Sequence, residues 1–221
     1  MVSKRIKVLI RSIVLSLSLF ICSQFLGALN VNNIKQVQAV NTRPPVIMLD
    51  MAHRDSIKDN GAEYLWWNER EIVNSITEKV AERLVNKGYT VTLTREYDQS
   101  ISINDRVKLA NNTDYDYYIS IHANSCEGCN KGTGVESYYN GTVTKILSEN
   151  ITRDLSSTFN IPNRGDFSSP YYNKRIPNST LLELGFINHD KDRDILLNEQ
   201  DKIADIIAFN VDIAYKTLSQ K

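Results

Sequence analysis

Two apolar segments that contain a titratable side chain are the most informative feature of the sequence. Ile119–Asn124 contains His122, and Leu181–Phe186 contains Glu183. Both segments have the pattern of buried strands, where an unpaired charge costs several kcal/mol unless a metal ion, an ion-pair partner or a proton compensates it. Packing gives no reason for a carboxylate in such a strand. The pattern therefore indicates a metal-dependent hydrolase site, and the alternative for Glu183 is a buried ion pair with Arg95 or Arg106.

The histidines support this interpretation. The chain has three, and both His53 and His122 follow or end a segment with the pattern of a strand. A catalytic zinc site typically has three protein ligands and keeps a fourth position for water, whose proton a nearby second carboxylate can accept. His53, Glu69, His122 and Glu183 can supply these parts, but they are far apart in the sequence and match no local spacing motif. A histidine packed in the core is the alternative for His122, and we expect His189, in a charged stretch, to be solvent-exposed.

Strands and helices alternate along the chain, which predicts a single α/β domain with a mostly parallel or mixed twisted sheet flanked by helices. The predicted strands are 46–50, 89–94, 117–121, 134–139 and 180–184. The predicted helices are 69–87, a short helix capped at Ser102, 142–159 and 200–218, and we expect a loop over 160–178. Sites in such sheets form beyond the carboxyl ends of the strands, where the two histidines and the helix start at Glu69 are placed.

The first 39 residues have the features of a targeting segment. Basic residues precede an apolar run from Ile13 to Leu29, and small residues suited to a signal peptidase follow up to Ala39. We expect cleavage after Ala39; the alternative is an uncleaved anchor that associates with the membrane, because the run lies at the short limit for spanning a bilayer. Either way, we expect export across the cytoplasmic membrane, with 40–45 as a linker and 46–221 as the catalytic domain.

The charge of the exported part disfavours nucleic acid as a partner. The whole chain has 26 basic and 26 acidic residues. The first 39 residues contain five of the basic residues and none of the acidic ones, so the exported part is left with 21 and 26 and a net charge of −5. Nucleic-acid binding normally requires a basic surface.

Two cysteines, Cys126 and Cys129, lie close together in a loop rich in Gly and Asn. A zinc knuckle would need a second such pair. We therefore expect either a disulfide that staples the loop outside the cell or two idle thiols.

Short motifs along 46–218 resemble a known family. They are Leu49–His53, Glu69, Gly88–Arg95, Arg106 with Ala110 and Asn111, Ser120–Asn124, Gly134–Glu136 and Leu182–Ile187. In these motifs and their order the chain resembles the zinc-dependent N-acetylmuramoyl-L-alanine amidases, which are secreted bacterial autolysins and sporulation amidases. Relatives of this size include those that trim the spore cortex for germination.

The resemblance implies a function and a set of roles. The substrate would be peptidoglycan, cleaved at the amide between N-acetylmuramic acid and the L-alanine of the stem peptide. His53, Glu69 and His122 would bind Zn²⁺, and Glu183 would be the catalytic carboxylate. The spacing to Gly88 selects Glu69 over its neighbour Glu71, although a glutamate at a helix start also has a structural explanation.

Polar and aromatic residues near these motifs are candidates for substrate contacts. The candidates are Asn124, Arg164, Tyr171 and Tyr172. For the aromatic loop residues, plain packing is an equal alternative. We expect Arg95 and Arg106 to be structural ion-pair partners.

One motif departs from the family. Relatives usually have glycine-histidine-glycine-glycine after the first strand, whereas this chain has Ala52, His53, Arg54 and Asp55. Glycines allow backbone conformations that other residues resist, so we expect His53 to be poorly pre-organised and an activating protein partner to order it. The altered loop makes a partner-dependent or catalytically weak peptidoglycan-binding relative one alternative to an active amidase. A zinc peptidase of another family, which would have a different ligand set, is a separate alternative.

Overall fold

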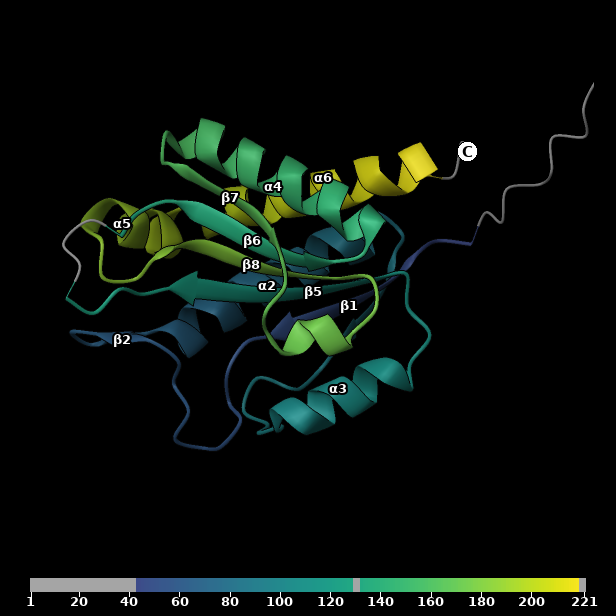
Figure 1. Ribbon diagram of the computed structural model, residues 1–221, viewed down its shortest axis with the longest axis horizontal. Helices are drawn as coiled ribbons and strands as arrows, with labels where there is room; N and C mark the ends of the chain where they lie inside the picture. The colour runs from purple at the N-terminus through teal and green to yellow at the C-terminus, as the bar shows by residue number, and fades with distance from the viewer. Residues whose placement is uncertain (1–42, 129–131, 219–221) are drawn as a thin grey trace, which may run out of the picture. The chain divides into compact units, whose positions relative to one another are not determined.

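A six-stranded mixed sheet forms the centre of the computed structural model (Figure 1). The structure describes residues 43–128 and 132–218, so the predicted signal segment and the first residues of the linker lie outside it. The strands are β1 (Val46–Met51), β4 (Thr90–Leu93), β5 (Tyr117–Asn124), β6 (Val135–Asn140), β7 (Asn163–Ser168) and β8 (Ser179–Phe186). Their order is β4-β1-β5-β8-β6-β7, and β6 runs antiparallel to β8. The predicted mixed α/β fold is confirmed.

Helices cover both faces of this sheet. Helices α2 (Glu69–Asn86) and α4 (Thr142–Phe159) pack against the strands on one face, and α6 (Gln200–Leu218) packs against both of these helices. Helix α3 (Ile103–Asn111) lies on the other side with the short 3-10 helix η2 (Tyr172–Arg175), as Figure 1 shows. No helix in the described part of the chain is both long and apolar enough to cross a bilayer.

The central strands are apolar because both of their faces are buried. On β1, Ile47 and Leu49 belong to the main core under α2, α4 and α6, while Met48 between them packs with Val107 of α3 in a smaller core. None of the three β1 side chains is exposed to solvent. Polar residues within these strands therefore need a specific compensation.

Three elements in the second half of the chain differ from the sequence prediction. Strand β7 and helix η2 lie in the stretch expected to be a loop, and helix α5 (Asp190–Asn198) follows β8. Strand β7 is a mostly polar edge strand that is held by its pairing with β6, so it has no apolar pattern. His189 is not a plain exposed residue: it is half-buried and caps α5, its ring nitrogen accepting from the Asp192 N–H at 3.4 Å.

A small hairpin precedes α2. Its strands are β2 (Glu63–Tyr64) and β3 (Trp67–Asn68), and Leu65 and Trp66 form its tip. No strand is predicted for this stretch from the sequence, but the structure forms a second, two-stranded sheet here.

The cysteine loop follows β5. Cys126 is disulfide-bonded. Cys22 and Cys129 lie outside the described residues. The Cys126–Cys129 staple therefore stays a prediction.

The sheet register places three titratable residues side by side. His122 on β5 pairs with Glu183 on β8, and Glu183 pairs in turn with Glu136 on β6. These pairs lie toward the carboxyl ends of β5 and β8, where the site was expected.

Candidate metal centre

His53, Glu69 and His122 converge, although nothing in their spacing links them. Each offers one ligand atom, and these atoms lie within 4.8 Å of one another. His53 follows β1, Glu69 is the first residue of α2, and His122 lies on β5. The structure thus brings together all three residues that were expected to bind the metal.

The carboxylate of Glu69 is fixed between the two imidazoles. Its Oε1 accepts from the Ala123 N–H at 3.0 Å and lies 3.1 Å from His122 Nδ1. Its Oε2 accepts from the Ala62 N–H at 3.0 Å and lies 2.9 Å from His53 Nε2. Glu71 is exposed, so the structure places Glu69 and not its neighbour in the centre.

The electrostatics of the cluster favour charged groups. Burial alone would raise the pKa of Glu69, but hydrogen bonds and charge from His122 and His53 outweigh it and hold the pKa below its usual range. Burial likewise would lower the pKa of His53, but Glu69 and Asp59 outweigh it and raise the pKa. In addition, His122 Nε2 is buried without a hydrogen-bond partner in the described structure. Two imidazoles and a carboxylate are suitable ligands for a metal ion, and the unpaired Nε2 of His122 is available to bind one.

Two further residues belong to this centre. Asp59 Oδ1 lies 3.2 Å from His53 Nδ1 and also accepts from the Gly61 N–H, so it orients the imidazole from behind. Gly61 has φ +69°, and a Cβ there would lie 2.5 Å from the His53 ring and 2.7 Å from Glu69 Oε2. Only glycine fits. The Asp-Asn-Gly turn signal in the sequence marks such a backbone, but it does not reveal what the turn faces.

Glu183 lies beside this cluster and lacks the ion pair considered for it. Its Oε2 is buried with no hydrogen-bond partner, and no ion pair reaches it within the described residues. Burial, reinforced by the charges of Glu69 and Glu136, raises its pKa well above the ordinary value. A cation at the neighbouring cluster would favour its ionised form.

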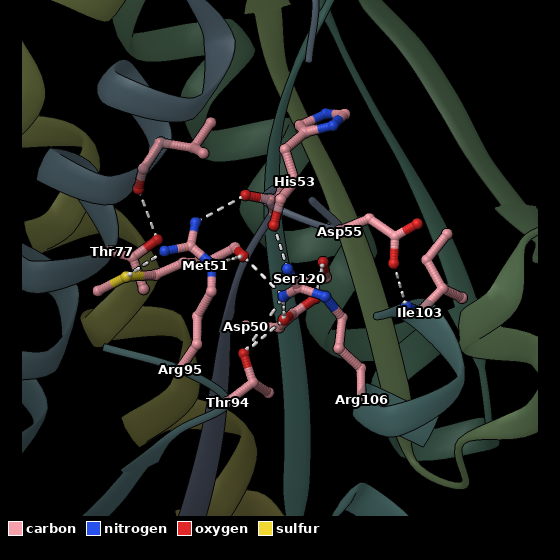
Figure 2. Close-up of polar contacts among 12 residues, drawn as sticks. Asp50, Met51, His53, Asp55, Thr77, Thr94, Arg95, Ile103, Arg106 and Ser120 are labelled. Atoms are coloured by element: carbon pink, nitrogen blue, oxygen red, sulfur yellow. Dashed lines mark hydrogen bonds and ion pairs between the residues drawn. The ribbon is translucent and has the colours of Figure 1, made fainter. Parts of the chain in front are cut away.

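The loop that carries His53 has a backbone suited to glycine. His53 has φ 61° and Arg54 has φ 67°, conformations that cost side-chain-bearing residues about 1–2 kcal/mol each. Three contacts hold it: the His53 carbonyl accepts from Arg106, the Arg54 carbonyl accepts from the Ile101 N–H at 3.0 Å, and Asp55 accepts from the Ile103 N–H at 2.8 Å. Figure 2 shows the contacts of Arg106 and Asp55. The loop is therefore anchored to the start of α3 by the chain itself.

Beneath the loop lies a buried polar network around Asp50. Its carboxylate accepts from Arg106, from Thr94 Oγ1 at 2.6 Å, from Ser120 Oγ at 2.8 Å and from the Tyr172 hydroxyl (Figure 2 shows the first three partners). Burial alone would raise the pKa of Asp50, but Arg106 and the hydroxyls hold it below its usual range. Arg106 is a structural ion-pair partner, as predicted.

Arg95 has a different role from the one expected. Its guanidinium donates to carbonyl oxygens, including Ala52 at 2.9 Å and Tyr97 at 2.9 Å, and to Asn74 Oδ1 at 2.6 Å. Within the described residues no carboxylate pairs with it. Arg95 therefore holds the backbone at the end of β1 through hydrogen bonds and not through an ion pair.

A pocket of about 330 Å³ opens over the cluster. Of the predicted substrate contacts, Asn124, Tyr171 and Tyr172 line it. Tyr172 is also tied to Asp50, and Asn124 Nδ2 donates to Glu136 at 2.9 Å. Arg164 donates to Glu136 at 2.6 Å instead of lining this pocket.

Comparisons with known proteins agree with this geometry. The family model for N-acetylmuramoyl-L-alanine amidase matches residues 47–211. YqiI of Bacillus subtilis, an uncharacterized protein, is 31% identical over 178 residues, which cover 76% of this chain and 84% of YqiI. The sporulation-specific N-acetylmuramoyl-L-alanine amidase of Bacillus subtilis is 31% identical over 64% of this chain and 56% of its own length. The structure of the amidase AmiC2 of Nostoc punctiforme superposes with a TM-score of 0.70 at 28% identity, covering 80% of this chain and 98% of that one.

The buried pair beneath the site leads to a pH-dependent prediction. Arg106→Met leaves Asp50 buried without its cation, and we expect the free energy of unfolding near neutral pH to fall by about 3–5 kcal/mol. In the unchanged protein the pKa of Asp50 is lowered from its ordinary value of 3.8. The ionised carboxylate therefore contributes to the free energy of unfolding at pH values above 3.8, and this contribution is lost as the pH falls toward the lowered pKa. In the variant an unpaired Asp50 has a raised pKa, so its destabilisation grows as the pH rises.

Urea denaturation of both proteins near pH 7 and near pH 4 measures this difference, which should be smaller at the acidic pH. Arg153→Met, whose side chain is 61% exposed, is the matched control and should change little at either pH. A loss that is the same at both pH values would contradict the assignment of Asp50 and Arg106 as a buried pair.

Proposed function

The chain belongs to the N-acetylmuramoyl-L-alanine amidase family of peptidoglycan hydrolases, and we propose that it cleaves the amide between N-acetylmuramic acid and L-alanine with a zinc ion held by His53, Glu69 and His122. The observation that carries the proposal is the pairing of a three-ligand cluster with Glu183 on the adjacent strand, whose Oε2 is buried without a hydrogen-bond partner among the described residues. A hydrolytic metal site needs both parts.

Zinc is the metal that suits this set of donors. Members of the family are generally metal-dependent. Two histidines and one glutamate form a common catalytic zinc set, and a structural zinc site would use a fourth protein ligand instead. Asp59 supports the choice, because a carboxylate behind a ligand histidine fixes its orientation and increases its basicity.

The chemistry divides between the ion and the chain. Held by His53, Glu69 and His122, a zinc ion would supply the Lewis acidity that activates the scissile carbonyl and the attacking water. Glu183 then accepts a proton from the attacking water and delivers it to the nitrogen of the departing L-alanine, which leaves as an amine. Its position beside His122 and its buried Oε2 suit a carboxylate that exchanges protons near neutral pH.

The walls of the pocket provide the substrate contacts in this proposal. Tyr171 is 47% exposed and packs edge-on against Tyr138, so its ring is held at the mouth of the pocket. Asn124 offers an amide beside the cluster, and Tyr172 also lines the pocket. Arg164 would contact substrate from the rim, where it is held by Glu136.

Export and partners follow from the substrate. Cell-wall amidases, including sporulation and germination types, are usually exported, and we infer that residues 1–39 direct export with cleavage after Ala39. An uncleaved segment would instead keep the protein at the membrane. The anchored His53 loop supports a site that is formed without an activating partner, and the family match supports the amidase and not a zinc peptidase of another family.

The metal assignment is tested on the histidines. We expect His122→Ala to lose stoichiometric zinc, because two remaining ligands cannot complete the site. His189→Ala is the matched control, since His189 is the one histidine outside the cluster, and it should keep the ion. Elemental analysis of the purified variants gives the answer. Full retention of zinc by His122→Ala, or its loss from His189→Ala, would refute the ligand set.

The role of Glu183 is separable from metal binding. Glu183→Gln should bind zinc as before but release L-alanine amino groups from muropeptides at least about 100-fold more slowly, because the proton acceptor is gone. Glu199→Gln, an exposed glutamate, serves as the control and should be unaffected. Near-normal turnover by Glu183→Gln would remove this residue from the mechanism.

A further inference from the structure

An exposed tryptophan stands at the tip of the hairpin beside the metal centre. Trp66 is 77% exposed and Leu65 is 65% exposed. Leu65 has φ 56°, a backbone conformation that is an outlier for a bulky residue. Strained residues of this kind cluster where a surface has a function. The tip therefore calls for an explanation other than packing.

The rest of the hairpin is packed against α5 and the main core, which holds the tip in place. The Arg193 guanidinium of α5 lies 5.0 Å from the Tyr64 ring and 4.8 Å from the Trp67 ring, so it contacts one ring on each hairpin strand. Trp67 also packs against the main core, and the centre of its ring lies 4.8 Å from the centre of the Trp66 ring. A rigid aromatic side chain loses little conformational entropy when it binds.

The hairpin is continuous with the catalytic pocket. Its six residues connect Ala62, which lines that pocket, with the metal-centre residue Glu69. A second hollow of about 710 Å³ is lined by Glu63 and Tyr64 of the hairpin and shares Ser125 with the catalytic pocket. Figure 1 shows β2 at the end of the sheet toward which β1 and β5 point. A polymer that extends beyond the catalytic pocket along this rim would reach the hairpin.

We propose that Trp66 forms a stacking platform for the glycan strand of peptidoglycan, outside the catalytic pocket. The proposal rests on the proposed function, because that function supplies the polymer. Sugar rings present C–H faces that pack on an indole, whose N–H remains free to bond a hydroxyl. Contacts made far from the reacting bond contribute binding energy that positions it.

The surroundings of the tip disfavour other occupants. Three exposed carboxylates, Glu63, Glu127 and Asp190, line the adjoining hollow and would repel an anionic membrane surface. The cation at the hairpin, Arg193, is only 12% exposed and is paired with Asp190 at 2.6 Å. A two-residue apolar tip is also much smaller than the contact that a stable protein partner requires.

The test is co-sedimentation with purified, insoluble peptidoglycan, in a Glu183→Gln background so that the polymer stays intact. Adding Trp66→Ala should weaken binding about tenfold, the effect expected for loss of a central aromatic contact. Trp66→Phe keeps a ring and should retain most of the binding. Phe209→Ala removes an aromatic that is 53% exposed on α6 and should bind like the background protein.

Three outcomes would overturn the proposal. They are unchanged binding by Trp66→Ala, an equal loss in Phe209→Ala, and Trp66-dependent sedimentation with phosphatidylglycerol vesicles in place of peptidoglycan. Thermal melts of each variant show whether the fold is kept, which is expected because Trp66 is exposed. Release of amino groups by the protein with Glu183 intact is measured separately. Its absence would contradict the proposed hydrolysis and leave the binding result standing.

Discussion

Compensation of buried carboxylates is the constraint on which this structure depends. Asp50 is compensated by Arg106 and three hydroxyl groups, and Glu69 by two imidazoles and two backbone N–H groups. Glu183 has no such partner within the described residues. Because an uncompensated buried charge is costly, compensation allows the first two carboxylates to stay ionised inside the fold, whereas the third has no structural explanation and points to chemistry. The proposed zinc ion supplies the positive charge that the arrangement around Glu183 lacks.

The same network explains how the chain manages without the usual glycines around His53. The strained backbone of His53 and Arg54 is held from below by Arg106 and from the side by Asp55 at the start of α3. The ion pair that compensates Asp50 thus also fixes the carbonyl of a metal-centre residue. The Arg106 guanidinium thus links fold stability to pre-organisation of the site. A loop of glycines would not need this support, because glycine adopts positive φ without strain.

Much of the fold and the site could be predicted from the sequence, for identifiable reasons. Apolar segments such as 117–121 and the helix capped at Ser102 carry local signals, and His122 and Glu183 stand out because charge is unexpected there. Strand β7 is held by pairing and not by apolar residues, so it was missed, as was α5 in its charged stretch. Asp59 and Gly61 were also missed: their importance lies in what they face, and only the folded loop brings them against His53.

The most direct test of the account is a crystal structure of the zinc-loaded protein with anomalous scattering measured on both sides of the zinc edge. The account predicts a single strong peak bonded to His53, Glu69 and His122, with Glu183 beside it but outside the set of ligands. It also predicts that the His53 loop keeps its contacts with Arg106 and Asp55 in the absence of any other protein. A peak bonded to His189 or Cys126, or a zinc-loaded centre that excludes His53, would contradict it.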